Sequence, residues 1–490
     1  MNKPIRYLAV ACMVMFLALL ANVNYVQFVE ADSLNARNGN QRVINEEFSR
    51  DRGPILVAGE PVAQSVPSDD EYRFQREYPD GPLYANLTGY FSYIYGRGAI
   101  ENSQNRVLSG SDNRLFVNRV VDLLSNTQPQ GGSVELTIDP LAQRTAAEGL
   151  EALGEDTKGA VAAINPQTGE ILALVTQPSY DPNRLASHDF PEVTKAWDAL
   201  TTSEAQPMLN RATQQTLPPG STFKLVTAAA ALENGVVDDI DDLVKGGARL
   251  SFPGIDYTLP NEGGGNCGGD EITFERALNV SCNVSFGDLA GQIGQADLAE
   301  QAEKFGFGSD PLQGLALSPS RFTSPGTDLE APQLAQSGIG QFEVAATPLQ
   351  MAMVTGAVAN DGQVMRPYVV DTVRSPNLTV LERTQPEELD RAMSSENAAK
   401  LRQALVSTVE RGTATSAQIS GVDVGGKTGT AQSTPDRPPY AWFVSFAPAD
   451  DPQVAVAVVV ESSDTARSEI AGGRLAGPIA RSVMEAVLGR

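Results

Sequence analysis

The chain has 490 residues, enough for two or three domains, and its apolar content suffices for a large core. It carries 36 basic and 60 acidic side chains, which gives a formal net charge of −24. A surface of this sign excludes non-specific capture of nucleic acid and gives no general attraction to anionic lipid. We therefore expect a multi-domain globular protein with no nucleic-acid partner.

The first thirty residues differ in kind from the rest of the chain. Lys3 and Arg6 precede an apolar run over residues 7–28, which is about long enough to cross a bilayer as a helix. The run is longer than the apolar core of a cleaved signal peptide, roughly 7–15 residues, although Val-Glu-Ala at 29–31 forms a weak cleavage site. We predict an uncleaved anchor in residues 1–32, with a cytoplasmic N-terminus and all the remaining chain outside the membrane.

Cysteine and histidine usage limits the chemistry. Cys12 lies inside the predicted anchor, so Cys267 and Cys282 are the only exported pair. Export favours a disulfide over two free thiols, and closing a loop of this size contributes on the order of 3 kcal/mol. The single histidine is His188, and no metal-ligand spacing occurs. We therefore expect no metal or other cofactor, and most histidine-dependent catalysis is excluded.

Residues 33–128 are polar, rich in glycine and asparagine, and irregular, with short aromatic clusters such as GYFSYIYG at 89–96. Nothing in this region repeats or carries a catalytic spacing. We predict a membrane-proximal pedestal or interaction domain made of short strands and loops.

Residues 129–490 are predicted to form one α/β domain. A strand in residues 131–140 precedes a helical run, and two strand-like runs, GAVAAINP and EILALVT, are joined by a hairpin turn. Three further strand-like segments, GVDVGGKTGTAQ, AWFVSFAP and QVAVAVVVE, precede a closing helix near the C-terminus. Because strands lie at both ends of a long, mostly helical middle, we expect one sheet that both ends of the domain complete.

The helical middle begins with LPPGSTFK, residues 217–224. The Pro-Pro-Gly break predicts a helix from Ser221, which places Ser221 and Lys224 about one turn apart on one face. A serine hydroxyl needs a base to act as a nucleophile, and a lysine can be that base when burial or a nearby cation lowers its pKa. The helix N-terminus adds N–H groups suited to a developing oxyanion. Because Ser-x-x-Lys also arises by chance on surface helices, this spacing is weak evidence when it stands alone.

A second candidate, Lys427-Thr428-Gly429-Thr430, lies in a predicted strand. Its ammonium and hydroxyl groups can bind a carboxylate, and Gly429 lets the backbone approach a ligand. A plain glycine turn explains the segment less well, because the preceding Gly-Gly pair already supplies the turn.

A third element, Ser-x-Asn, is expected in the same site, and its candidates begin at Ser111, Ser281, Ser375 and Ser395. The first precedes Ser221 and lies outside the predicted sheet domain, the third contains a proline in a turn, and the fourth resembles an ordinary helix start. Ser281-Cys282-Asn283 falls between two helix-like runs, a connection that could point the serine and asparagine one way and the cysteine the other. We choose Ser281 and Asn283, with Cys282 bonded to Cys267 behind the site.

Taken in order, Ser221-x-x-Lys224, Ser281-x-Asn283 and Lys427-Thr428-Gly429 resemble the three signatures shared by penicillin-binding proteins and serine β-lactamases. Residues 130–490 are similar to the transpeptidase domain of class B penicillin-binding proteins, in the stretches LTIDPLAQ, GAVAAINPQTGEILALVTQPSYDPN, LPPGSTFK, GIGQFEVAATPLQMA, KTGTAQ and AWFVSFAP. RGPI at 52–55 is similar to the start of the family's membrane-proximal domain, and the short amino-terminal region is most similar to an actinobacterial branch of the family. The resemblance implies an antiparallel five-stranded sheet flanked by helices, preceded by a small β-rich domain and a transmembrane helix.

The resemblance also implies a D,D-transpeptidase that cross-links peptidoglycan stem peptides outside the membrane. Ser221 would attack the carbonyl between the terminal D-Ala residues, Lys224 would take its proton, and Ser281 would relay a proton to the departing D-alanine. The implied substrate-binding residues are Asn283, Lys427, Thr428, Gly429 and Thr430. Backbone N–H groups of Ser221 and Thr430 would bind the oxyanion. β-Lactam antibiotics would acylate the same serine.

Two positions depart from the family patterns. Tyr440 stands where the family often has histidine. Glu275 begins the string Glu-x-x-Leu-Asn, which in class A β-lactamases supplies the glutamate that positions the deacylating water. In those enzymes the string follows Ser-x-Asn, whereas here it precedes it, so we interpret the match as a coincidence.

Three alternatives remain at this stage. A D,D-carboxypeptidase or β-lactamase would use the same site and let water accept the acyl group. A β-lactam sensor would need a cytoplasmic signalling segment, and only six residues precede the apolar run. A non-enzymatic scaffold would have lost reactivity, whereas all three motifs are complete. The roughly 100 residues between the anchor and the sheet domain are too few for a glycosyltransferase module, so we expect a separate glycosyltransferase or division or elongation proteins as partners.

Overall fold

The computed structural model describes residues 3–30, 34, 45, 47–115, 130–432, 437–465 and 470–490. Its first helix, α1 (Lys3–Phe28), is apolar and has no buried side chain. In the described part of the chain, it is the one helix long and apolar enough to cross a membrane. The predicted domain boundaries, between residues 32 and 33 and between residues 128 and 129, lie outside the described residues.

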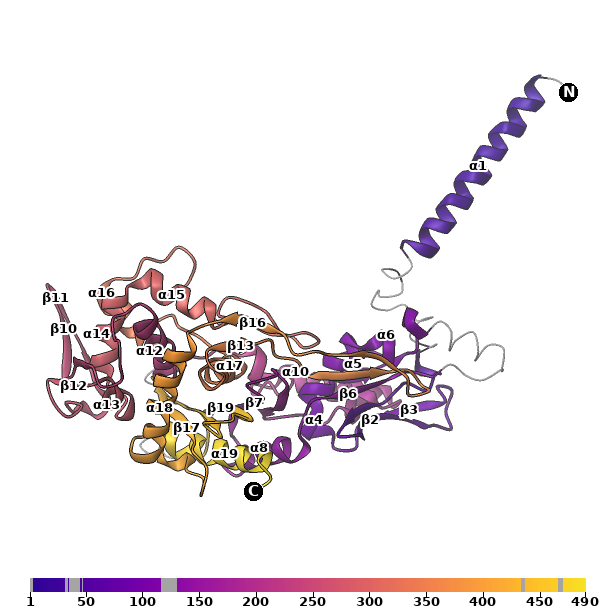
Figure 1. The fold of residues 1–490 in the computed structure, drawn as a ribbon. Coiled ribbons are helices and arrows are strands. Elements are labelled where there is room, and N and C mark those ends of the chain that lie inside the picture. Colours follow the sequence, from indigo (N-terminus) through magenta and orange to yellow (C-terminus); the bar gives the residue numbers. More distant parts are fainter. Residues whose placement is uncertain are drawn as a thin grey trace.

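An antiparallel sheet of five strands forms the centre of the larger domain, in the order β17-β18-β19-β7-β8 (Figure 1). The strands are β7 (Lys158–Ile164), β8 (Ile171–Gln177), β17 (Gly425–Ala431), β18 (Tyr440–Ala447) and β19 (Val454–Ser462). β19 pairs with β7, so β7 and β8 form one continuous ladder with the last three strands of the chain. The predicted sheet, completed from both ends of the domain, is confirmed.

Helices cover both faces of this sheet because its strands are apolar on both sides. Neighbouring residues such as Phe443 and Val444 on β18 belong to two different buried clusters, one on each face. On one face lie α8 (Pro140–Glu151) and α19 (Gly472–Val487), which also pack against each other. On the other face α17 (Pro348–Ala359), buried along its whole length, crosses β7, β18 and β19.

The helical middle of the chain forms a lobe beside the sheet. Its main elements are η2 (Gly220–Phe223), α12 (Lys224–Glu233), α13 (Phe274–Asn279), α14 (Asn283–Ile293), α15 (Gln295–Lys304), α16 (Ala331–Gly338) and α18 (Ser395–Arg411). The helix α10 (Phe190–Thr202) lies apart from this lobe and packs against α9 (Asn183–Ala186). Residues 224–232 of α12 are all buried, and the helix packs against α14, α15 and α18. An alanine-rich helix permits this close packing, since small side chains let neighbouring helices approach.

A second sheet links the amino-terminal region to later parts of the chain, with strand order β15-β14-β6-β1-β2-β3. The strands are β1 (Ile55–Val57), β2 (Glu60–Pro67), β3 (Phe74–Glu77), β6 (Ser133–Leu136), β14 (Val370–Arg374) and β15 (Val380–Arg383). The strand expected in residues 131–140 therefore exists as β6, but it lies in this sheet, parallel to β1 and antiparallel to β14. Alternation of apolar residues predicts a strand without naming its partner, which is why the sequence did not reveal this link.

Buried charges hold the amino-terminal region together. Arg52, from the RGPI stretch, and Arg76 both bond Glu101, at N···O distances of 2.6 and 2.7 Å, with all three side chains buried. Glu101 also accepts a hydrogen bond from the Tyr78 hydroxyl. Because the carboxylate is fully paired, removal of any one partner would leave a buried charge and strongly destabilise this region.

Smaller elements complete the fold. The short helices are α4 (Gly81–Thr88), α5 (Ala99–Ser103), α6 (Asn105–Leu108), η1 (Asn113–Leu115), α9 (Asn183–Ala186), α11 (Arg211–Gln214), η3 (Glu262–Gly264) and η4 (Thr415–Ala417). The two-stranded sheets pair β4 (Phe91–Ser92) with β5 (Gly96–Arg97), β9 (Leu243–Lys245) with β12 (Glu271–Thr273), β10 (Arg249–Phe252) with β11 (Ile255–Pro260), and β13 (Gln363–Met365) with β16 (Glu388–Arg391). Figure 1 shows β10 and β11 at the end of the molecule opposite β2 and β3.

Candidate active site

Ser221 lies in the 3-10 turn η2, which leads directly into α12. The sequence predicts a helix from Ser221, and the structure tightens this first turn so that the regular α-helix begins at Lys224. Gly220 has a φ of +54°, a left-handed conformation that favours glycine. The turn leaves the Ser221 side chain slightly exposed at 8%, whereas Lys224 is completely buried.

Lys224 is held by the Ser-x-Asn segment. Its Nζ lies 2.7 Å from the Ser281 carbonyl oxygen, 2.7 Å from Asn283 Oδ1 and 3.2 Å from Ser281 Oγ. The same ammonium or amine group lies 5.5 Å from the centroid of the Phe286 ring. Among the hydrogen bonds of these described residues, none joins Lys224 Nζ to the Ser221 hydroxyl, so a direct contact between them would require a small movement during reaction.

Ser281 and Asn283 occupy the connection between α13 and α14, as predicted from the sequence. Ser281 has a φ of +58°, an unusual conformation for a residue with a side chain. The Cys282 N–H donates to Ala277 O at 2.9 Å, and the Ser281 N–H donates to Leu278 O at 3.1 Å. These bonds hold the strained turn, so that Ser281 and the first residue of α14 both point toward Lys224.

Lys427 comes from β17, the edge strand of the central sheet. Its buried Nζ donates to Ser281 Oγ at 2.7 Å and to Thr428 O at 3.0 Å. The Ser281 hydroxyl therefore lies between the two lysines. Three segments that are far apart in the sequence thus meet at one hydroxyl group.

Burial changes the ionisation of both lysines. Burial first, and the charge of Lys427 second, hold the pKa of Lys224 well below its usual value, against an opposing effect of Glu262. Burial lowers the pKa of Lys427 to about 7, again opposed by Glu262. The charge of Lys427 disfavours that of Lys224, so when one proton is shared between the two lysines the arrangement favours its placement on Lys427.

The hydrogen-bond partners agree with this distribution of charge. A neutral amine has two N–H groups and one lone pair, and the Ser281 carbonyl and Asn283 Oδ1 can only accept. These two acceptors use both N–H groups of Lys224. A protonated Lys224 would donate its third N–H to Ser281 Oγ, to which Lys427 also donates. When Lys224 is neutral, the Ser281 hydroxyl proton can point at its lone pair instead. A base and a proton relay are therefore arranged in one network.

The edge of β17 lies against the serine turn. A Cβ atom on Gly220 would come within 2.8 Å of the Thr430 carbonyl oxygen, and one on Gly429 within 3.0 Å of the Pro219 carbonyl oxygen. Since the C=O and N–H of one strand residue point to the same side, the Thr430 N–H also faces the serine turn. The geometry can thus offer a strand N–H to an oxyanion formed at Ser221. Thr428 Oγ1 lies 2.9 Å from Thr413 Oγ1 at the exposed side of the same strand.

A cleft of about 440 Å³ opens beside these residues. Ser221, Asn283 and Thr430 line it together with Tyr257, Leu259, Pro260, Asn261, Glu262, Gly263, Gln336, Ile339, Gln341 and Gln432. Sequence reasoning missed the contributions from residues 257–263 and 336–341. These residues lie in loops and short elements without a spacing that marks them, so only their position in the fold identifies them.

A second cleft, of about 330 Å³, adjoins the first. It is lined by Glu262, Thr413, Thr415, Ser416, Thr428, Thr430, Ala471, Gly472, Gly473 and Arg474. The two clefts share Thr430 and Glu262. The Lys-Thr-Gly-Thr strand therefore separates two open spaces, each suited to part of an extended ligand.

The other Ser-x-Asn candidates lie in local structural roles. In the string that begins at Ser111, the Asp112 carboxylate accepts a hydrogen bond from the Arg114 N–H. Ser375 bonds Asn377 and the Thr379 carbonyl within one turn. Ser395 is the first residue of α18. None of these residues lines either described cleft.

The two departures from family patterns also have structural explanations. Tyr440 is buried at the start of β18, paired with Ala431 beyond the Lys-Thr-Gly-Thr segment. Glu275 lies on α13 and bonds Arg411 of α18 at 2.9 Å. It lines neither of the two described clefts, which supports reading its β-lactamase-like string as coincidence.

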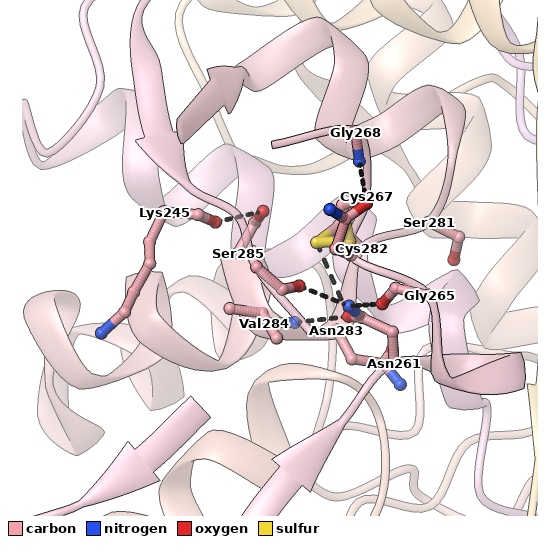
Figure 2. The surroundings of a disulfide bond; sticks show 12 residues. Lys245, Asn261, Gly265, Cys267, Gly268, Ser281, Cys282, Asn283, Val284 and Ser285 are labelled. Atoms are coloured by element: carbon pink, nitrogen blue, oxygen red, sulfur yellow. Dashed lines mark hydrogen bonds between the residues drawn. A yellow bond between two sulfur atoms is a disulfide. The ribbon is translucent and has the colours of Figure 1, made fainter. Parts of the chain in front are cut away.

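Cys267 and Cys282 are joined by a disulfide bond, with Cys282 lying between Ser281 and Asn283 (Figure 2). Non-reducing peptide mapping of the exported protein should find one cross-linked pair, and Cys267→Ser should lower the free energy of unfolding by about 3 kcal/mol. Cys12→Ser is the matched control and should change neither result. Free, alkylatable thiols at both positions in the exported protein would contradict the bond.

In the described residues, no group of three or more histidine, cysteine, aspartate or glutamate side chains is arranged to hold a metal ion.

Comparison with known proteins establishes the family. Residues 159–485 match the family described as penicillin binding protein transpeptidase domain, and the chain belongs to this family. Residues 52–134 match the family described as penicillin binding protein A dimerisation domain. The predicted resemblance to class B penicillin-binding proteins is confirmed.

Individual relatives are similar over the whole chain. The chain is 41% identical to the peptidoglycan D,D-transpeptidase PbpA of Mycolicibacterium smegmatis, covering 100% of this chain and 99% of that relative. It is 40% identical to the protein of the same name from Mycobacterium tuberculosis, with the same coverage. A solved structure of M. tuberculosis penicillin-binding protein A, as a ceftriaxone acyl-enzyme complex, matches with a TM-score of 0.85 at 39% identity, covering 91% of this chain and 100% of that one. The predicted likeness of the amino-terminal region to an actinobacterial branch of the family is confirmed.

Proposed function

We propose that this chain is a peptidoglycan D,D-transpeptidase that acts through an acyl-enzyme on Ser221 and is inhibited covalently by β-lactams. The observation that carries the proposal is the buried network in which Lys224 and Lys427 share the Ser281 hydroxyl beside Ser221. The names of its relatives and the acyl-enzyme state of the matched structure support the same reaction.

In the first half of the reaction, Ser221 Oγ attacks the carbonyl between the two terminal D-Ala residues and its proton passes to neutral Lys224. The bond from that carbon to the D-alanine nitrogen then breaks, and a proton reaches this nitrogen through Ser281. The N–H groups of Ser221 and Thr430 hold the oxyanion. An amine of a neighbouring stem peptide then displaces Ser221 from the acyl carbon.

The binding roles follow from position. Asn283 holds the donor peptide's amide, since it is both anchored beside Lys224 and exposed to the first cleft. Lys427 and the hydroxyls of Thr428 and Thr430 receive the terminal carboxylate, since Thr430 lines both clefts, Thr428 lines the second, and buried Lys427 belongs to the same strand. Gly429 keeps the strand close to the serine turn.

The location is part of the same proposal. α1 acts as an uncleaved single-pass anchor, since it is 26 residues long and basic residues precede its apolar run. The N-terminus lies in the cytoplasm and the catalytic domain outside the membrane, where a disulfide is stable. The region of residues 33–128 serves as a pedestal for a separate glycosyltransferase or for division or elongation proteins.

The lifetime of the penicillin adduct tests this proposal. Intact-mass analysis of the full-length protein in detergent, mixed with benzylpenicillin and followed over hours, should show a stable addition of one penicillin molecule. A donor peptide ending in D-Ala-D-Ala, supplied with an acceptor amine, should give a cross-linked product. An adduct that hydrolyses within seconds would favour a β-lactamase, and peptide trimming without cross-linking would favour a D,D-carboxypeptidase.

A further inference from the structure

Glu262 is an acidic residue at the border between the two clefts. It lines both clefts, and among the described residues that line either cleft it alone carries a carboxylate. The other side chains that line the first cleft are neutral. Among those that line the second, Arg474 carries a positive charge. Glu262 also acts on the charge of both catalytic-site lysines, which places it within electrostatic reach of the reacting centre.

The loop that carries Glu262 is anchored to the Ser-x-Asn segment. Asn283 Nδ2 donates to the Pro260 carbonyl at 3.1 Å, and the Val284 N–H donates to Asn261 Oδ1 at 3.0 Å. Asn261 Nδ2 donates to the Gly247 and Gly265 carbonyls at 2.8 and 2.7 Å.

The disulfide adds a covalent tether to the same segment. Figure 2 shows Asn261 bonded to Gly265 beside the sulfur atoms. Residues 263–265 are all glycine, so the chain after Glu262 would be loose without these ties. The fold thus fixes the position of a carboxylate that is exposed at the mouth of the site.

The chemistry of the second half-reaction requires a cation to come to this position. An amine acceptor is protonated at neutral pH, so it arrives as an ammonium ion. Its nitrogen must reach the acyl carbon by the reverse of the path along which the D-alanine nitrogen left. Thr430 and Glu262 line both clefts, so a path that runs where the clefts meet passes these two residues.

We propose that Glu262 is the residue that captures the ammonium group of the acceptor and so favours aminolysis of the acyl-enzyme over hydrolysis. The inference rests on the proposed transpeptidase function. In the step it serves, the nitrogen forms a bond to the acyl carbon and the bond from that carbon to Ser221 Oγ breaks. The ammonium group loses two protons in all, one of which returns to Ser221 Oγ and the other of which passes to solvent. Glu262 binds and positions the acceptor and is not itself the base.

The test compares a cationic with an uncharged acceptor. Full-length protein in detergent is acylated by a synthetic pentapeptide ending in D-Ala-D-Ala. It then receives either a stem tetrapeptide with a free side-chain ammonium group or hydroxylamine, which is uncharged at neutral pH. For Glu262→Gln, the half-saturating concentration of the tetrapeptide should rise on the order of tenfold, the factor expected for loss of one charge-assisted hydrogen bond. Hydroxylamine converts the acyl-enzyme into a hydroxamate, and the yield of this product should fall far less in Glu262→Gln.

Matched variants make the result specific. Glu262→Asp should recover part of the preference for the tetrapeptide, because it keeps the charge. Glu271→Gln, on the exposed strand β12 outside both clefts, should match the wild type. The ratio of the product yields with the two acceptors is compared between variants, because a change in the reactivity of the acyl-enzyme itself affects both yields and cancels.

The outcomes separate this inference from the proposed function. An equal loss with both acceptors, or no loss with either, in a protein whose wild type cross-links peptides would overturn the role of Glu262 alone. A wild type that forms no acyl-enzyme with the donor peptide would overturn the transpeptidase proposal as well.

Discussion

Ser221→Ala should abolish the covalent adduct with benzylpenicillin, leaving no detectable mass increase where the wild type gains one penicillin molecule. The reason is that the variant lacks the one hydroxyl of the serine turn that lines the first cleft, since Thr222, the other hydroxyl of η2, is buried and donates to the Pro219 carbonyl. Among the hydrogen bonds of the described residues, none involves the Ser221 hydroxyl, and Ser221 is only 8% exposed. The free energy of unfolding should therefore change by less than about 1 kcal/mol. Intact-mass analysis and thermal unfolding measure the two effects.

Ser285→Ala provides a matched control for the loss of a hydroxyl near the site. Ser285 lies on α14, is buried, and bonds the Lys245 carbonyl at 2.7 Å outside both clefts. This variant should form the adduct at the wild-type rate. If Ser221→Ala still gained one penicillin molecule, a peptide map would locate another nucleophile, and the assignment of Ser221 would be wrong. If the wild type itself gained none while folded, a scaffold function would take the place of the enzyme.

Lys224→Ala should lower the rate constant for acylation by roughly 10²–10⁴-fold, the usual contribution of a positioned general base. Burial and the charge of Lys427 lower the pKa of Lys224, so at a given pH the wild type holds more of its neutral base than a solvent-exposed lysine would. In the variant, hydroxide must replace the base, so its residual rate should keep rising with pH into the alkaline range. Stopped-flow acylation with a chromogenic cephalosporin across pH measures both the loss and the altered profile.

Lys224→Met separates loss of the base from loss of packing. Methionine fills most of the buried space beside Phe286 but has no basic nitrogen. It should lose as much acylation as Lys224→Ala while unfolding at a higher temperature. Lys245→Met removes an exposed lysine paired with Asp288 and should leave acylation unchanged. Near-normal acylation in both Lys224 variants would move the role of base to another group, with Lys427 as the first candidate.

The three motifs were predictable because each is a short, local spacing on one element. Ser221 and Lys224 are three residues apart across a helix start, and Lys427 to Thr430 occupy consecutive positions of a strand. The choice of Ser281 among several Ser-x-Asn strings also rested on local pattern, since two helix-like runs flank it and the other strings have ordinary turn or cap roles. The strands of the central sheet followed from apolar runs long enough to be buried on both faces.

The remaining features depend on contacts between distant residues. The sequence did not show that β6 and β14 would join the amino-terminal strands, because alternation gives a strand but not its neighbour. It gave no sign of Tyr257, Glu262 or Gln336 at the site, because these residues belong to a strand, a 3-10 turn and a helix whose local patterns do not show what they face in the fold. Glu262 becomes notable only once Asn261, the disulfide and α14 fix its position.

The sequence by itself determined the family, the reacting groups and the elements that carry them, since these depend on residue type and on spacing along a helix or strand. Only the tertiary structure decided which groups share a hydrogen-bond network and how they are charged. One Ser281 hydroxyl bridges Lys224 and Lys427, whose side chains lie 203 positions apart in the sequence yet are both fully buried. Desolvation lowers the pKa values of both lysines, and the charge of Lys427 further lowers that of Lys224. Both effects exist only when the folded chain has removed water and brought the two groups together.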